Sequence, residues 1–182
     1  GIPGRREATG RGVVITALEA MKQLGIDPAK ATAVVQGFGN VGSVAAALLH
    51  ESGIKVVGAS DVHAAFADPK GLDIPAMLAH AASKGSLRGY AGASPIDGME
   101  VLELPCDVLV LAAAANQVTG ENAPRLQCRM IAEGANAHTT PDADAVLAQK
   151  NVLVIPDILC NAGGVFVSYL EYTQETQQLH TP

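Results

Sequence analysis

Three consecutive segments decide the fold: Ala31-Thr-Ala-Val-Val-Gln36, then Gly37-Phe38-Gly39-Asn40-Val41-Gly42, then Ser43-Val-Ala-Ala-Ala-Leu-Leu-His-Glu51. The first is short, apolar and rich in β-branched residues, as expected of a strand buried on both faces of a sheet. The second is a complete G-x-G-x-x-G pattern, and the third is typical of a helix. A strand, a glycine turn and a helix in this order predict a doubly wound α/β fold with a parallel sheet.

Each glycine of the turn has a physical role in binding a dinucleotide. Gly37 permits the tight turn, Gly39 lets the backbone approach a pyrophosphate, and Gly42 lets the helix pack close to the strand. The helix N-terminus presents N–H groups to phosphate oxygens. The alternative is a glycine-rich loop without a ligand, but the strand–turn–helix setting favours a Rossmann-type cofactor site. The whole turn, with Phe38, Asn40 and Val41, is therefore a candidate cofactor site.

The remaining sequence continues the alternation of strands and helices. Apolar runs predict strands over 55–60, 107–112, 129–133 and 152–155, and periodic segments predict helices over 7–24, 73–84, 140–150 and from 161–164 to about 177. Residues 63–72 and 85–100 are expected to be loops. Continuous apolar strands of this kind predict a parallel sheet covered on both faces.

Composition excludes several classes of protein. The 182 residues are 48% hydrophobic and 16% charged, which suits a folded domain and excludes a disordered chain. The longest apolar run, over 108–115, falls short of the roughly 20 residues that cross a bilayer. A net charge of −6 with scattered Lys and Arg predicts no binding of nucleic acid.

The cysteines indicate a reducing compartment. Cys106, Cys128 and Cys160 are odd in number and widely spaced, so they suggest neither a disulfide framework nor a zinc site. Each is expected to be a small buried hydrophobic residue. The sequence thus predicts a cytoplasmic protein without a metal site.

Asp61 is a second candidate cofactor residue. It closes the predicted strand 55–60 and lies about 20 residues beyond the glycine turn, where a carboxylate can bind the hydroxyls of the adenosine ribose. Such a carboxylate repels a 2′-phosphate and so favours NAD over NADP. Lys70 is the nearest Lys or Arg after it, and His63 is the one nearby group that could offset the repulsion. The alternative is that Asp61 caps a loop.

Several segments together resemble the Glu/Leu/Phe/Val dehydrogenase family, over nearly the whole chain. They are Gly4-Arg5-Arg6-Glu7-Ala8-Thr9-Gly10-Arg11-Gly12-Val13, the glycine turn with Gln36, Ala132-Glu-Gly-Ala-Asn136 with Thr139-Thr-Pro141, and Pro156-Asp157 through Asn161-Ala-Gly-Gly-Val165. The ending Val165-Phe-Val-Ser168-Tyr169-Leu-Glu171 is similar to the glutamate branch.

The resemblance implies roles for individual residues. It places Arg5 and Thr9 at the nicotinamide end, and Asn136 and Asn161 at the nicotinamide and its ribose. An amide offers both a donor and an acceptor to such groups. The other cofactor residues that it implies are Val62, Ala112, Ala113 and Asn116. The residues that it places at the substrate side chain are Val165 and Ser168, three apart on one helix face.

Plainer interpretations of these residues stay open. Asn136 follows Gly134 and could be a turn residue, Asn161 could cap the last helix, and Ser168 could lie on a helix surface. The chain also departs from the family pattern beside the implied cofactor site. The departures are at Leu111, Ala115, Ala137 and His138.

The resemblance implies that catalysis needs a lysine in a glycine-rich segment and an aspartate, both in a separate N-terminal domain. No such lysine segment is found here; Lys84 precedes Gly85 but ends a predicted helix. Residues 1–182 are therefore expected to be the NAD(P)-binding domain of a homo-oligomeric enzyme that converts L-glutamate to 2-oxoglutarate and ammonia, and to be inactive alone. The alternatives are a stand-alone regulatory dinucleotide-binding module and a dehydrogenase for another amino acid.

Overall fold

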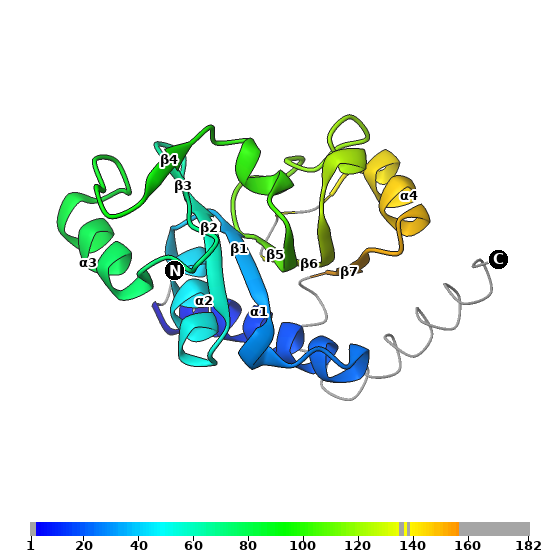
Figure 1. Cartoon of the computed structure of the whole chain (residues 1–182), viewed down its shortest axis with the longest axis horizontal. Coiled ribbons are helices and arrows are strands. Elements are labelled where there is room, and N and C mark those ends of the chain that lie inside the picture. Colours follow the sequence, from blue (N-terminus) through cyan, green and yellow to red (C-terminus); the bar gives the residue numbers. More distant parts are fainter. Residues whose placement is uncertain (1–2, 135–136, 138, 157–182) are drawn as a thin grey trace.

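The computed structural model describes residues 3–134, 137 and 139–156, which form a sheet in the strand order β4-β3-β2-β1-β5-β6-β7 (Figure 1). The five parallel strands are β1 (Thr32–Gln36), β2 (Lys55–Ser60), β5 (Cys106–Leu111), β6 (Cys128–Glu133) and β7 (Leu153–Ile155). All five are predicted strands, so the doubly wound α/β fold is confirmed.

The predicted loops 63–72 and 85–100 are wrong in part, because each contains a short strand. β3 (Ala65–Ala67) pairs antiparallel with β2, and β4 (Ser94–Ile96) pairs antiparallel with β3. Three residues are too few to show an alternating pattern. Pro95 also argues against a strand, but proline is tolerated on an edge strand such as β4.

Helices form layers on the two faces of the sheet. The α-helices are α1 (Pro3–Leu24), α2 (Asn40–Glu51), α3 (Ile74–Lys84) and α4 (Pro141–Gln149). The 3₁₀ turns are η1 (Pro28–Lys30), η2 (Glu100–Glu103) and η3 (Ala123–Arg125). In Figure 1, α1 and α2 lie below the sheet, while α4 lies at its β7 end.

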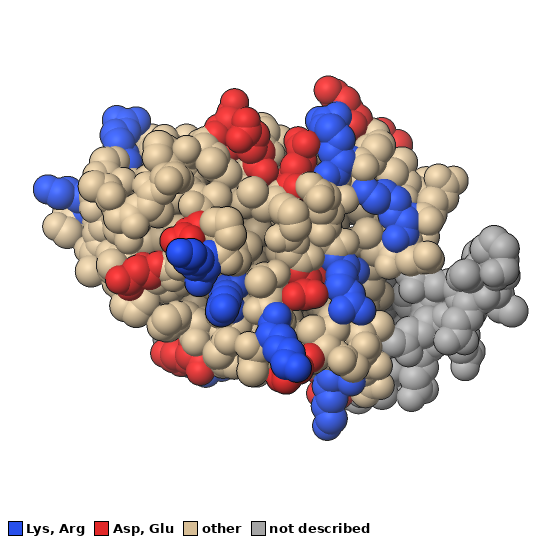
Figure 2. Space-filling model, viewed as in Figure 1, with Lys and Arg blue, Asp and Glu red and all other residues tan. Residues whose placement is uncertain are grey.

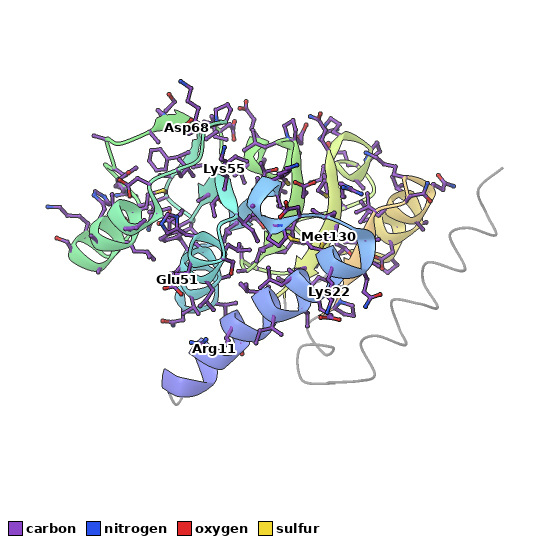
Figure 3. The ribbon with its side chains drawn as sticks, turned by 60° about the horizontal axis from the view of Figure 1, so that its bottom comes forward. Arg11, Lys22, Glu51, Lys55, Asp68 and Met130 are labelled. Carbon is purple, nitrogen blue, oxygen red and sulfur yellow. The ribbon has the colours of Figure 1, made fainter. Side chains whose placement is uncertain are left out.

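A hydrophobic core lies on each face of the sheet, and successive side chains of β1 belong alternately to one core and the other. Ala33 and Val35 pack with buried residues of α1, α2 and α3, including Met21, Leu49 and Met77. Val34 packs on the opposite face with residues of η2, η3 and α4. Figure 3 views the first layer, with α1 crossing in front of the strands between Arg11 and Lys22. β1 is therefore buried on both faces, as its sequence predicts.

Helix ends follow local chemistry in most cases. The side chains of Asp73 and Thr140 accept hydrogen bonds from Ala76 N and Ala143 N at the starts of α3 and α4. α2 begins at Asn40 and not at Ser43, so its first turn includes the last residues of the glycine turn. The predicted helix from 161–164 to about 177 lies outside the described residues. Within the described chain, no helix has the length and apolar character needed to span a membrane.

Candidate functional site

A pocket of about 650 Å³ opens at the carboxyl ends of β1, β2 and β5. β1 lies between β2 and β5, so the chain crosses to opposite sides of β1 at this point. In doubly wound folds, ligands bind at such a switch point. The pocket is lined by the end of β1 and the glycine turn, by residues after β2 and β5, and by the loops after α3 and β4.

Two glycines of the turn are in tight contact with neighbouring backbone, and the third faces open space in the pocket. Gly37 has φ +99°, and a Cβ there would lie 2.6 Å from the carbonyl carbon of Ala112. A Cβ on Gly42 would lie 1.7 Å from the carbonyl oxygen of Gly37. A Cβ on Gly39 would meet nothing within 4 Å, and Gly39 lines the pocket. Two glycines are thus required by packing, while the third leaves room for a ligand.

The N-terminus of α2 faces this open position. Gly39 is the N-cap residue, and no side chain there accepts a hydrogen bond from the first turn. The first N–H groups of a helix have no partner within the helix, and they carry a partial positive charge. The turn therefore fits a pyrophosphate, which needs N–H donors and close approach to the backbone.

Asp61 lies at the pocket but also holds its loops. Oδ1 accepts hydrogen bonds from His63 N and Ala64 N, over 2.8 and 2.9 Å, and Oδ2 accepts one from Leu87 N over 2.7 Å. Each carboxylate oxygen can accept more than one bond, so Oδ2 retains capacity for a ribose hydroxyl. Asp61 is a loop-capping residue and a pocket residue at once.

Two glutamines also line the pocket, at the end of β1 and after β5. Gln36 Nε2 donates to Gln117 Oε1 over 3.3 Å, and Gln117 Nε2 donates to the carbonyl of Ala115 over 3.4 Å. Gln36 is 6% exposed, and its Oε1 is buried without a hydrogen-bond partner among the described residues. Neither glutamine is among the residues predicted for the site, although Gln36 directly precedes the turn.

The pocket brings together part of the predicted cofactor set. The predicted residues that line it are Gly37, Phe38, Gly39, Asp61, Val62, Ala112 and Ala113. Gly42 packs beneath the turn, and Asn40 and Val41 form the start of α2. Asn116 follows β5 with φ +63°, a conformation that asparagine tolerates. These four are not among the lining residues.

The other predicted residues lie in α1 or outside the described chain. Thr9 precedes Gly10, where a Cβ would lie 2.8 Å from Val44 Cβ, so this part of α1 packs against α2. Arg5 belongs to the first turns of the same helix. The predicted residues outside the described ranges are Asn136, Asn161, Val165 and Ser168.

Glu133 connects the end of β6 to the segment before α4. It is 4% exposed, and its Oε2 accepts a hydrogen bond from Thr139 N over 2.8 Å. Gly134 follows it, and Gly134 N donates to the carbonyl of Leu111 over 2.7 Å. The end of β6 is therefore fixed next to the end of β5, beside the pocket.

Among the described residues, none of the titratable groups with a clearly shifted pKa lines the pocket. Burial raises the pKa of the Cys128 thiol to about 11 and also raises the pKa of Cys106, its neighbour across β5 and β6. Burial, with a smaller effect from Asp73, raises the pKa of Tyr90. A hydrogen bond from Thr140 lowers the pKa of Asp142.

Charges of both signs are interspersed on the face shown in Figure 2.

Comparison with known proteins agrees with this geometry. The chain matches the Glutamate/Leucine/Phenylalanine/Valine dehydrogenase family over residues 1–181. It is 47% identical to a glutamate dehydrogenase of Thermotoga maritima over 178 residues, covering 97% of this chain and 43% of that protein. A catabolic enzyme of Bacillus subtilis described as an NAD-specific glutamate dehydrogenase is 45% identical over 97% of this chain and 41% of its own length.

Solved structures give the same result. A hetero-hexameric glutamate dehydrogenase of Thermus thermophilus superposes with a TM-score of 0.78 at 34% identity, covering 95% of this chain and 41% of that one. A Plasmodium falciparum glutamate dehydrogenase has a TM-score of 0.77 at 32% identity, covering 95% and 39%. The chain thus spans about two fifths of these relatives' length. It belongs to the Glutamate/Leucine/Phenylalanine/Valine dehydrogenase family.

Proposed function

We propose that this chain binds a nicotinamide dinucleotide across the carboxyl ends of β1, β2 and β5. The open position above Gly39, at the uncapped start of α2, carries the proposal. The helix N–H groups would hold the pyrophosphate. Asp61 would accept hydrogen bonds from the adenosine ribose, and the residues after β5 would lie toward the nicotinamide half, as expected for this fold.

The longer protein is proposed to oxidise L-glutamate to 2-oxoglutarate and ammonia. Support comes from relatives, which are named glutamate dehydrogenases at 45–47% identity. The bound dinucleotide supplies the acceptor for hydride. By resemblance, Arg5, Thr9, Asn136 and Asn161 hold its nicotinamide end, and Val165 and Ser168 contact the substrate side chain. The residues that move protons are proposed to lie in another part of the longer protein.

The proposed preference is for NAD over NADP. Asp61 places a carboxylate at the pocket where a 2′-phosphate would approach, and the Bacillus subtilis relative is described as NAD-specific. A like-charge contact of this kind costs on the order of 1–3 kcal/mol, or roughly 5- to 150-fold in affinity. Calorimetric titration of the chain with both cofactors tests it. NAD is expected to bind more tightly by that factor, and equal or inverted affinities would contradict the role of Asp61.

A further inference from the structure

Cys106 and Cys128 are neighbours at the amino-terminal ends of β5 and β6. They are paired in the parallel register of these strands, and both belong to the core that contains residues of η3 and α4. They are 8% and 7% exposed, and both are free thiols. The sequence predicts no metal site because the two cysteines are far apart along the chain, but the pairing of β5 with β6 brings them together as a dithiol.

The spacing of the two strands favours a bridging ion over a disulfide. Side chains at paired positions of parallel strands project from the same face of the sheet, and neighbouring strands lie about 4.8 Å apart. The Cβ atoms of the pair are therefore separated by a similar distance, whereas a disulfide needs them about 3.8 Å apart. A metal ion in linear coordination, with bonds of about 2.3 Å to sulfur, holds its two sulfur atoms about 4.6 Å apart.

The number and type of ligands select the ion. Over residues 3–134, 137 and 139–156, no group of three or more His, Cys, Asp or Glu side chains is placed to hold a metal ion. Structural zinc and iron–sulfur clusters take four ligands from the protein, so two thiols do not suit them. Soft thiolate ligands select Cu(I), which accepts two of them in a linear arrangement. The pair therefore matches Cu(I).

Lys150 supplies a positive charge beside the pair. Its Nζ donates hydrogen bonds to the carbonyl oxygens of Ala123, Pro124 and Leu126, over 3.3, 2.7 and 2.6 Å, so the ammonium group is held next to η3. Burial raises the pKa of Cys128, and the charge of Lys150 opposes this rise. Two thiolates with one Cu(I) ion carry a net negative charge, which the ammonium group offsets.

Asp107 places a negative charge near Cys106, where it adds to the effects of burial and of Cys128 in raising the pKa of that thiol. Asp107 is itself engaged by its neighbours. Its Oδ2 accepts a hydrogen bond from Thr32 N over 2.9 Å, and its Oδ1 lies 3.8 Å from Arg129 Nη1. The arginine therefore offsets the charge of this carboxylate.

We propose that Cys106 and Cys128 form a binding site for one Cu(I) ion, coordinated by both sulfur atoms. Each thiol gives its proton to solvent as its sulfur binds, and the ion keeps its oxidation state. The site lies at the amino-terminal ends of β5 and β6, whereas the cofactor pocket lies at the carboxyl ends of the strands. The inference therefore does not depend on the proposed function.

Competition with the Cu(I) chelator bicinchoninate, without oxygen, tests the assignment. Cys106→Ser and Cys128→Ser each remove one ligand and should weaken Cu(I) binding by more than about 100-fold, because loss of even an outer-shell partner costs about 10- to 100-fold. Cys160→Ser is the matched control and should bind one Cu(I) ion per chain with the affinity of wild type. Wild-type affinity in Cys106→Ser or Cys128→Ser, or its loss in Cys160→Ser, would overturn the inference.

A count of released protons tests the site without altering its two ligands. Burial raises the pKa of both thiols, so both are protonated at neutral pH. Each Cu(I) ion that binds to Cys160→Ser should therefore release two protons, measured by calorimetry in two buffers with different ionisation enthalpies. Release of one proton or none would show that the ion does not bind both sulfur atoms, and would also overturn the inference.

Discussion

A Cβ on Gly42 would lie 1.7 Å from the carbonyl oxygen of Gly37, far inside any real contact. Because that oxygen belongs to the backbone of the turn, no side-chain rotation can relieve the clash. Gly39, two residues after Gly37, would place its Cβ in open space. The same short turn therefore contains two glycines needed for packing, Gly37 and Gly42, and one, Gly39, that leaves room for a ligand.

This contrast predicts different outcomes for two alanine variants. Gly42→Ala should lower the free energy of unfolding by about 1–3 kcal/mol or more, because the turn and α2 must move apart. Gly39→Ala should cost less, about 0.5–1 kcal/mol, because its Cβ would meet nothing and alanine is only a poorer N-cap than glycine, but it should weaken NAD binding. Urea unfolding and calorimetry measure the two effects. A Gly39→Ala chain that binds NAD as wild type does would refute the phosphate position.

Asp61 predicts a stability effect as well as a binding effect. Asp61→Ala leaves the N–H groups of His63, Ala64 and Leu87 without their acceptor. The free energy of unfolding should fall by about 1.5–3 kcal/mol. Asp68→Ala is the control, because Asp68 Oδ1 accepts one bond, from Lys70 N. If both variants unfold at the same urea concentration, Asp61 does not hold the loops.

The buried thiol of Cys128 predicts a loss of stability at alkaline pH. Its pKa rises from 9.0 to about 11 in the folded chain, so the folded state keeps its proton where the unfolded state loses it. The resulting contribution to the free energy of unfolding is fully present below pH 9 and is lost as the pH rises toward 11. Between pH 8 and 10.5, wild type should lose about 1–2 kcal/mol more than Cys128→Ala. Parallel curves for the two proteins would show that the thiol is not protected by burial.

The chain alone is predicted not to oxidise glutamate. The lysine and aspartate that the resemblance requires are proposed to lie elsewhere in the longer protein, and proximity and acid–base catalysis supply much of such a rate. Formation of NADH from NAD and L-glutamate, followed at 340 nm, measures it. Gly42→Ala purified in the same way controls for contaminating enzyme. Steady NADH formation by wild type alone would mean that the catalytic groups are present here.

The predictable parts of the fold are those determined by residues that are adjacent in the sequence. β1, the glycine turn and α2 follow from local propensity and from the apolar run before the turn. β3 and β4 were not predictable, because each has three residues and forms through pairing with a distant segment. α2 begins at Asn40, earlier than predicted, and its N-cap Gly39 has no capping side chain that would mark the start in the sequence.

The residues of the site likewise divide into those predictable from local sequence and those brought together only by the fold. The turn and Asp61 could be identified by their spacing and their place after strands. The contacts of Gln36 with Gln117, of Asp61 with Leu87 and of His63 with Arg88 join residues far apart in the chain. A single sequence contains no local signal for such pairs. His63, two residues from Asp61, is therefore predictable as its neighbour, whereas Arg88 is not.

An NMR titration of the ¹⁵N-labelled chain with NAD tests the central claim most directly. If the pyrophosphate binds the start of α2, the amide signals of Gly39, Asn40, Val41 and Gly42 should shift in a saturable way, while those of α4 stay in place. NADP should shift the same amides at higher concentration. Unchanged amides over 39–42 at saturating NAD, or shifts confined to another region, would contradict the account.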